Sequence, residues 1–202
     1  EKSSWIRKMF EEGLRMKQEY GVNNVFDLSL GNPVVEPPEQ VCQAIASAAN
    51  DTSPGLHRYM PNAGLNDVRD AIAQSISVES SVKLTADHIV MVCGAAGGLN
   101  ITLKTLLDPG EEVIVFSPFF VEYLFYSENH GGKTVTVPTN EDFSLNFRGL
   151  RDALSPKTKA VIINSPNNPT GVVYSRKMLE ELASILKKYS SDNNNPIYLI
   201  SD

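Results

Sequence analysis

Residues 164–171 read Asn-Ser-Pro-Asn-Asn-Pro-Thr-Gly, and they directly follow a short apolar run, Ala-Val-Ile-Ile, at residues 160–163. Such a run, bounded by turn-forming residues, predicts a strand that is buried on both faces. Two prolines and a glycine give the octapeptide a non-repetitive backbone. Taken singly, these residues also suit an ordinary polar loop. Asparagine amides at the carboxyl end of a buried strand, however, lie where open α/β sheets bind ligands. We therefore take the octapeptide as a candidate binding loop.

Apolar runs of strand length alternate with stretches of helical periodicity from residue 85 onward. This alternation predicts a three-layer α/β/α domain with a mostly parallel sheet covered on both faces. The predicted strands are residues 88–92, 113–116, 134–137, 160–163 and 197–200, and the predicted helices are residues 94–107, 120–129, 146–154 and 176–189. Upstream, periodicity predicts a helix over residues 4–20, and a second helix is expected to begin after Pro37-Pro38.

Composition excludes several classes of function. The net charge of -6 provides no basic surface for nucleic acid or anionic membranes. No apolar run approaches the ~20 residues of a membrane span, and the first residues do not form a signal peptide. Cys42 and Cys93 are too few and too isolated for a disulfide framework or a zinc site, so a cytoplasmic location is expected.

A second loop at the predicted edge has the residues of an anion site. Residues 94–97, Gly-Ala-Ala-Gly, place small side chains at a helix N-terminus, where free N–H groups and the helix dipole suit a phosphate. A tight helix start without a ligand is the alternative. Dinucleotide binding is disfavoured, because the glycine spacing is wrong and the next strand ends at Phe116-Ser117 instead of an acidic residue. Residues 132–134, Gly-Lys-Thr, lack the first glycine of a phosphate-binding P-loop. Taken alone, the residues predict an α/β domain with an anion site.

The octapeptide also resembles the signature loop of class I/II aminotransferases, the fold-type-I enzymes that use pyridoxal 5'-phosphate. Residues 59–69 support the resemblance, because they have the form Tyr-x-x-x-x-Gly-Leu-x-x-x-Arg. In that family the tyrosine of this segment reaches the cofactor phosphate of the neighbouring subunit. The resemblance therefore assigns this role to Tyr59 and implies a homodimer. It spans most of residues 25–202.

The resemblance implies further site residues. By its position in the octapeptide, Asn168 would bond the cofactor's phenolic oxygen, while Asn164 and Asn167 would hold the loop. Asp202 follows the last predicted strand, where the family places an aspartate against the pyridine nitrogen so that the ring acts as an electron sink. Phe120 occupies the ring-stacking position, where many members have tryptophan or tyrosine.

Two more contacts follow from the same resemblance. The phosphate would lie on Gly94, Ala95 and Ala96 at the helix start. Gly31, within the Leu-Gly-Asn-Pro of residues 30–33, would lie at the substrate carboxylate.

The family's Schiff-base lysine has no counterpart at a matching position. Lys133, Lys157 and Lys159 lie in other segments. We therefore expect the chain to be an incomplete part of a longer enzyme, inactive by itself. Residues 1–35 would contribute to the small domain, and residues 36–202 would form the N-terminal part of the large cofactor domain.

The expected activity is transfer of an amino group from an α-amino acid to a 2-oxo acid, with aspartate as a candidate donor. Two alternatives stay open. One is a pyridoxal-phosphate-dependent carbon–sulfur lyase, and the other is a non-catalytic regulatory module that binds the same cofactor.

Overall fold

The structure of the protein, a computed structural model, describes residues 5–26, 28, 31 and 35–202. The chain forms two compact units, Glu1–Tyr59 and Met60–Asp202, and we describe each by itself. The first unit contains helices α1 (Trp5–Tyr20) and α2 (Glu39–Asn50) and a short 3-10 turn, η1 (Val22–Asn24). Both helices were predicted from the sequence. Residues 27–33, Asp-Leu-Ser-Leu-Gly-Asn-Pro, have the sequence of a short strand that breaks into a turn, and most of them lie outside the described residues.

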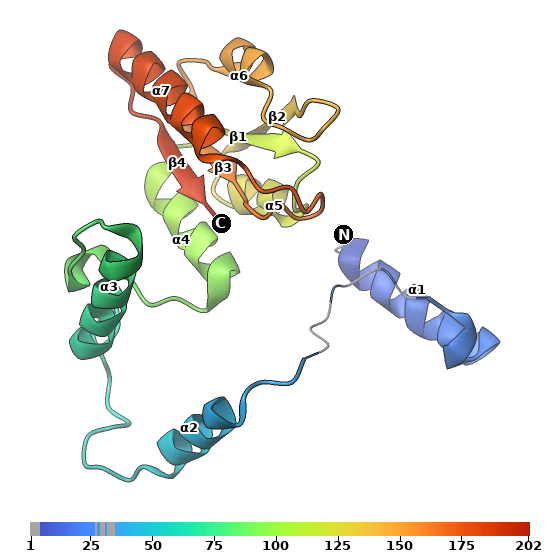
Figure 1. Ribbon diagram of the computed structural model, residues 1–202, viewed down its shortest axis with the longest axis vertical. Helices are drawn as coiled ribbons and strands as arrows, with labels where there is room; N and C mark the ends of the chain where they lie inside the picture. Colours follow the sequence, from blue (N-terminus) through green and yellow to red (C-terminus); the bar gives the residue numbers. More distant parts are fainter. Residues whose placement is uncertain (1–4, 27, 29–30, 32–34) are drawn as a thin grey trace. The chain divides into compact units, whose positions relative to one another are not determined.

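The second unit is an α/β domain (Figure 1). Its helices are α3 (Asn66–Ser80), the 3-10 turn η2 (Ala86–His88), α4 (Gly94–Leu106), α5 (Glu122–Glu128), α6 (Phe147–Ala153) and α7 (Arg176–Asn193). Its strands are β1 (Glu112–Ser117), β2 (Lys133–Pro138), β3 (Thr158–Ile163) and β4 (Tyr198–Ser201).

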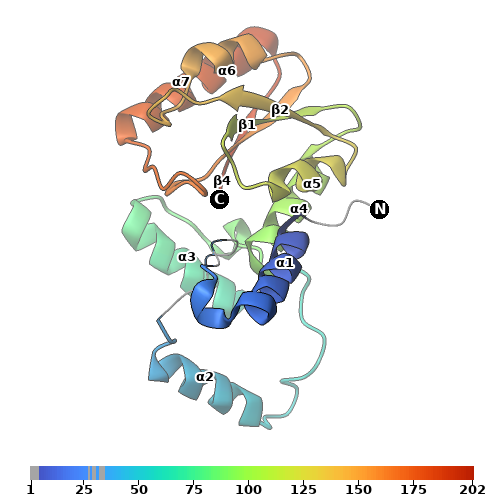
Figure 2. The same ribbon diagram turned by 90° about the vertical axis from the view of Figure 1, so that its right-hand side faces the viewer.

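The four strands form one sheet in the order β2-β1-β3-β4, and every neighbouring pair is parallel. Figures 1 and 2 show α4 and α5 on one face of this sheet and α6 and α7 on the other. The three-layer α/β/α architecture with a parallel sheet is therefore confirmed. All four strands point the same way, so the loops that follow them emerge at one edge.

Alternation along the strands divides the core into two clusters. Ile114, Phe116, Val161 and Ile163 face α6 and α7, where Leu150, Leu182 and Leu186 are buried. Their neighbours Val113, Val115, Ala160 and Ile162 face the other way, toward Leu99 and Leu103 of α4 and the tyrosines of α5. Successive side chains of a strand point to opposite faces, so a strand covered on both faces is apolar throughout. This periodicity explains why β1 and β3 read as continuous apolar runs.

One predicted strand does not form. Residues 89–93 are irregular and follow η2, although residues 88–92 were predicted as a strand. Within the described chain this segment has no strand beside it; the main-chain N–H of Met91 donates to Ala63 O at 2.9 Å. A strand is stabilised by pairing with a neighbour, and an apolar run cannot supply that neighbour.

No helix among the described residues is both long enough and apolar enough to cross a bilayer.

Candidate functional site

The carboxyl edge of the sheet brings the octapeptide beside Asp202. Strands β3 and β4 are paired so that Ile163 lies opposite Ser201. The main-chain N–H of Asp202 continues this pairing and donates to Ile163 O at 2.9 Å. Residues 164 and 202, far apart in the sequence, are therefore neighbours where the two strands end.

Asn164 connects the octapeptide to Asp202 through both ends of its amide. Its Nδ2 donates to the main-chain oxygen of Asp202 at 3.1 Å. Its Oδ1 accepts from the main-chain N–H of Asn168 at 2.6 Å. One side chain thus fixes the backbone at the two positions that the sequence assigned to the cofactor ring.

Asn167 and Asn168 are adjacent, yet they are placed very differently. Asn167 is buried, with 8% exposure, and its Oδ1 accepts from the Thr170 hydroxyl at 2.9 Å and the Thr170 N–H at 3.2 Å. Its main-chain oxygen accepts from Gly171 N–H at 2.7 Å. Asn168 is exposed, and its amide makes no hydrogen bond to another described residue. Asn167 therefore stabilises the turn, whereas the Asn168 amide stays available to a ligand.

The Asp202 side chain accepts a hydrogen bond from a residue that the sequence did not single out. The Tyr123 hydroxyl, on α5, donates to Asp202 Oδ2 at 2.5 Å. Burial, together with the neighbouring carboxylate, raises the pKa of Tyr123 well above its usual range, because both disfavour the phenolate. The tyrosine is therefore a neutral donor near neutral pH.

Two phenylalanines hold the Tyr123 ring. The Phe120 ring meets it edge-on with centroids 5.8 Å apart, and the Phe119 ring is stacked at 6.4 Å. Phe120 is half-buried at the exit of β1, so the proposed stacking ring contacts the residue that binds Asp202. Phe120 and Tyr123 share one face of the helix predicted for residues 120–129, but the sequence did not indicate the partner of Tyr123.

The N-terminus of α4 is not capped by a side chain, and of its first N–H groups that of Gly94 donates to Val92 O at 3.2 Å. The first turn contains no acidic residue. Gly94 has φ +70, a conformation that favours glycine, and a Cβ there would meet open space. Ala95 and Ala96 are exposed. Helix α4 is anchored beside α5 through the core cluster that contains Tyr123.

Two predicted site residues lie in the other compact unit. The Tyr59 side chain is fully exposed there. Gly31 is exposed as well, and nothing lies within 4 Å of a Cβ built on it. Residues 32–34, which complete the predicted Gly31 turn, lie outside the described residues.

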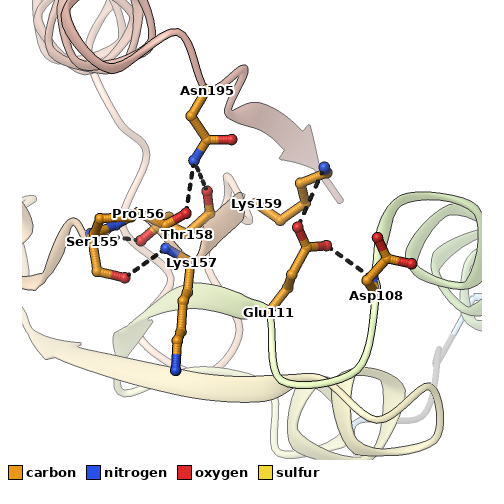
Figure 3. A network of polar contacts seen from close by, with 8 residues as sticks. All are labelled: Asp108, Glu111, Ser155, Pro156, Lys157, Thr158, Lys159 and Asn195. Carbon is orange, nitrogen blue, oxygen red and sulfur yellow. Dashed lines mark hydrogen bonds and ion pairs between the residues drawn. The ribbon is translucent and has the colours of Figure 1, made fainter.

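The three lysines considered above lie at the starts of strands and not at their ends. Lys133 is the first residue of β2, while Lys157 and Lys159 flank the start of β3. Lys159 Nζ lies 3.4 Å from Glu111 Oε1, in a network at the amino edge of the sheet (Figure 3). In that network Asn195 Nδ2 donates to the main-chain oxygens of Pro156 and Thr158, each at 3.2 Å. These lysines therefore lie at the edge opposite to Asp202.

Comparison with known proteins gives a consistent result. The family model for aminotransferase class I and II matches residues 23–191. Aspartate aminotransferase of Pyrococcus abyssi is 39% identical over 183 residues, covering 89% of this chain and 45% of that protein. Aspartate/prephenate aminotransferase of Thermus thermophilus is 36% identical over 177 residues, covering 87% and 44%.

Solved structures agree with these relatives. An amino transferase from Eubacterium rectale superimposes with a TM-score of 0.93 at 36% identity, covering 99% of this chain and 51% of that one. A double mutant of Thermus thermophilus aspartate aminotransferase gives a TM-score of 0.82 at 34% identity, covering 100% and 50%. The chain spans about half the length of the relatives it matches. It belongs to the aminotransferase class I and II family.

Proposed function

We propose that the protein containing this chain is a pyridoxal-phosphate-dependent aminotransferase, which transfers the amino group of an α-amino acid to a 2-oxo acid. The observation that carries the proposal is the link through Asn164, which joins the main chain of Asn168 to the main chain of Asp202 in a chain of this family. Aspartate is the proposed donor, since several relatives are named aspartate aminotransferases.

The groups at the sheet edge suit this cofactor. Asp202 Oδ1 has no hydrogen bond to another described residue, so the carboxylate retains an oxygen for a ring N–H. The Asn168 amide can donate to a phenolic oxygen. The uncapped α4 N-terminus suits a phosphate dianion, and Phe120 offers an aromatic face. Each feature matches a different part of one phosphorylated pyridine.

The residues then have separate roles in the reaction. When bound, pyridoxal phosphate supplies an electron sink for the negative charge that develops at the substrate α-carbon. Asp202 holds a proton on the ring nitrogen by charge, and Asn168 orients the ring through its oxygen. The helix N-terminus and its small residues anchor the phosphate. A lysine contributed by the rest of the protein would move the α-proton.

The domain and subunit assignments belong to the same proposal. Residues 1–35 would contribute to the small domain and residues 36–202 to the large domain. Tyr59 would reach the phosphate in the neighbouring subunit of a homodimer, a role that its full exposure permits. The cytoplasm remains the proposed location.

An amino-acid panel tests the proposed function. We expect the full-length protein, supplied with 2-oxoglutarate, to form glutamate and one keto acid from a preferred donor. The pure 202-residue chain should form neither, because the family's Schiff-base lysine has no counterpart at a matching position and Lys133, Lys157 and Lys159 lie at the edge opposite to Asp202. Keto acid and ammonia formed without the acceptor would indicate a lyase instead. Turnover by the 202-residue chain would contradict the assignment of the lysine to the rest of the protein.

A charge placed at the α4 N-terminus separates phosphate binding from helix stability. We expect Ala95→Asp to weaken pyridoxal phosphate binding at least about tenfold, because a carboxylate would repel the phosphate. The same carboxylate interacts favourably with the helix dipole, so the free energy of unfolding should stay equal or rise by about 0.3–1 kcal/mol. Fluorescence titration and thermal unfolding of the full-length variant measure the two effects. Ala95→Ser is the control, and equal affinity of Ala95→Asp and wild type would exclude this phosphate site.

A further inference from the structure

We propose that Tyr123 is a positioning residue, whose hydroxyl fixes the orientation of the Asp202 carboxylate toward the cofactor ring. The inference rests on the proposed function and adds a residue to its site. It starts from the contact between Tyr123 Oη and Asp202 Oδ2 at 2.5 Å, which joins residues 79 positions apart in the sequence.

Tyr123 is well suited to fix another side chain, because its own position is determined by packing. Its side chain is 2% exposed and lies in the core cluster between the sheet and α4. Phe119, Phe120 and Tyr126 all contact its ring. The hydroxyl therefore points from a fixed place in the core to the end of β4.

Asp202 depends on a side-chain partner for its orientation. Its main chain is held at the sheet edge by Ile163 and Asn164. Those bonds place the Cα but leave rotation of the side chain free. Among the described residues, the Tyr123 hydroxyl makes the hydrogen bond to the carboxylate. That contact selects one orientation and leaves Oδ1 for a ligand.

The chemistry of the donor also fits this role. The pKa of Tyr123 is raised by burial and by the carboxylate, so the phenol stays protonated and neutral. A neutral donor orients a carboxylate without cancelling its charge, whereas a lysine or arginine would compete with a protonated ring nitrogen. Tyr123 thus holds Asp202 in place while preserving the negative charge that the ring requires.

The test compares Tyr123→Phe with Tyr126→Phe in the full-length protein. Both tyrosines are buried on α5, but only the first bonds Asp202. We expect Tyr123→Phe to weaken binding of pyridoxal phosphate to the apoprotein about tenfold, since a hydrogen bond to a charged group is lost. The pH dependence of the bound cofactor's absorbance should also shift, because the ring nitrogen is held less well. Tyr126→Phe should change neither property more than about twofold.

Two further measurements separate positioning from packing. A cofactor analogue with carbon in place of the ring nitrogen should bind Tyr123→Phe and wild type equally. In an Asp202→Ala background, adding Tyr123→Phe should cause no further loss of affinity, because coupled residues are non-additive. Additive losses, or an equal loss with the analogue, would show that Tyr123 acts only through packing.

The outcomes also distinguish this inference from the proposed function. If the wild-type apoprotein does not bind pyridoxal phosphate, the proposed function is wrong. If it binds and Tyr123→Phe has the same affinity and the same absorbance profile, the proposed function stands and the role of Tyr123 is wrong. Asp202→Ala alone keeps the inference testable if Tyr123→Phe fails to fold. A wild-type affinity and absorbance profile in that variant would contradict it.

Discussion

Replacing Asp202 with alanine in the full-length enzyme is expected to lower turnover by about a hundredfold to a few thousandfold. The substitution would leave the protonated ring nitrogen without its counter-charge, in a pair that the bound cofactor would bury. Removing one partner of a buried ion pair costs about 3–5 kcal/mol, and each 1.36 kcal/mol changes a rate about tenfold. Steady-state kinetics with the preferred amino acid would measure the loss.

Expression and folding should change far less than activity. Asp202 is exposed in this chain and its main-chain bonds to Ile163 and Asn164 do not involve the side chain. Asp152→Ala is a matched control, because this aspartate is exposed on α6 and has no hydrogen bond to another described residue. Its turnover should equal that of wild type. Normal turnover by Asp202→Ala would show that Asp202 is not part of the site.

Replacing Asn164 with alanine should give the second largest loss of function, because one substitution removes the hydrogen bonds that hold both Asn168 and Asp202. The variant loses the bond to Asp202 O and the bond to Asn168 N–H. At about 0.5–1.5 kcal/mol for each hydrogen bond, we expect the free energy of unfolding to fall by about 1–3 kcal/mol. We also expect cofactor affinity to fall about tenfold or more, since both Asn168 and Asp202 would lose their fixed backbone. Chemical denaturation and cofactor titration measure the two quantities.

Two further variants show whether the Asn164 link itself matters. Asn164→Asp keeps the acceptor for Asn168 N–H but removes the donor to Asp202, so it should retain the turn while weakening the ring-nitrogen contact. Asn140→Ala also removes an amide that makes two hydrogen bonds, donating to Ser144 Oγ at 2.8 Å and to Leu145 O at 3.3 Å in the loop after β2. It should lower stability without lowering cofactor affinity. Equal affinity losses in Asn140→Ala and Asn164→Ala would reduce the role of Asn164 to general stability.

The sequence predicted the sheet well where strands are covered on both faces. The apolar runs of β1 and β3 belong to central strands, so their pattern reflects burial that the fold provides. Residues 88–92 include a similar apolar run, yet they form no strand, because pairing depends on a neighbour that the local pattern does not specify. Periodicity thus reports which residues can be buried, and pairing decides which runs become strands.

The candidate site divides in the same way. Local sequence determined the turn of the octapeptide, the small residues at the start of α4 and the aspartate that follows β4, because each depends on residues within one short segment. Only the tertiary structure brought Asn164 to Asp202 and placed the Tyr123 hydroxyl on its carboxylate, since these contacts join segments 38 and 79 residues apart. Parallel pairing of β3 with β4 and burial of α5 on the sheet bring these residues within hydrogen-bonding distance. Both are properties of the packed chain.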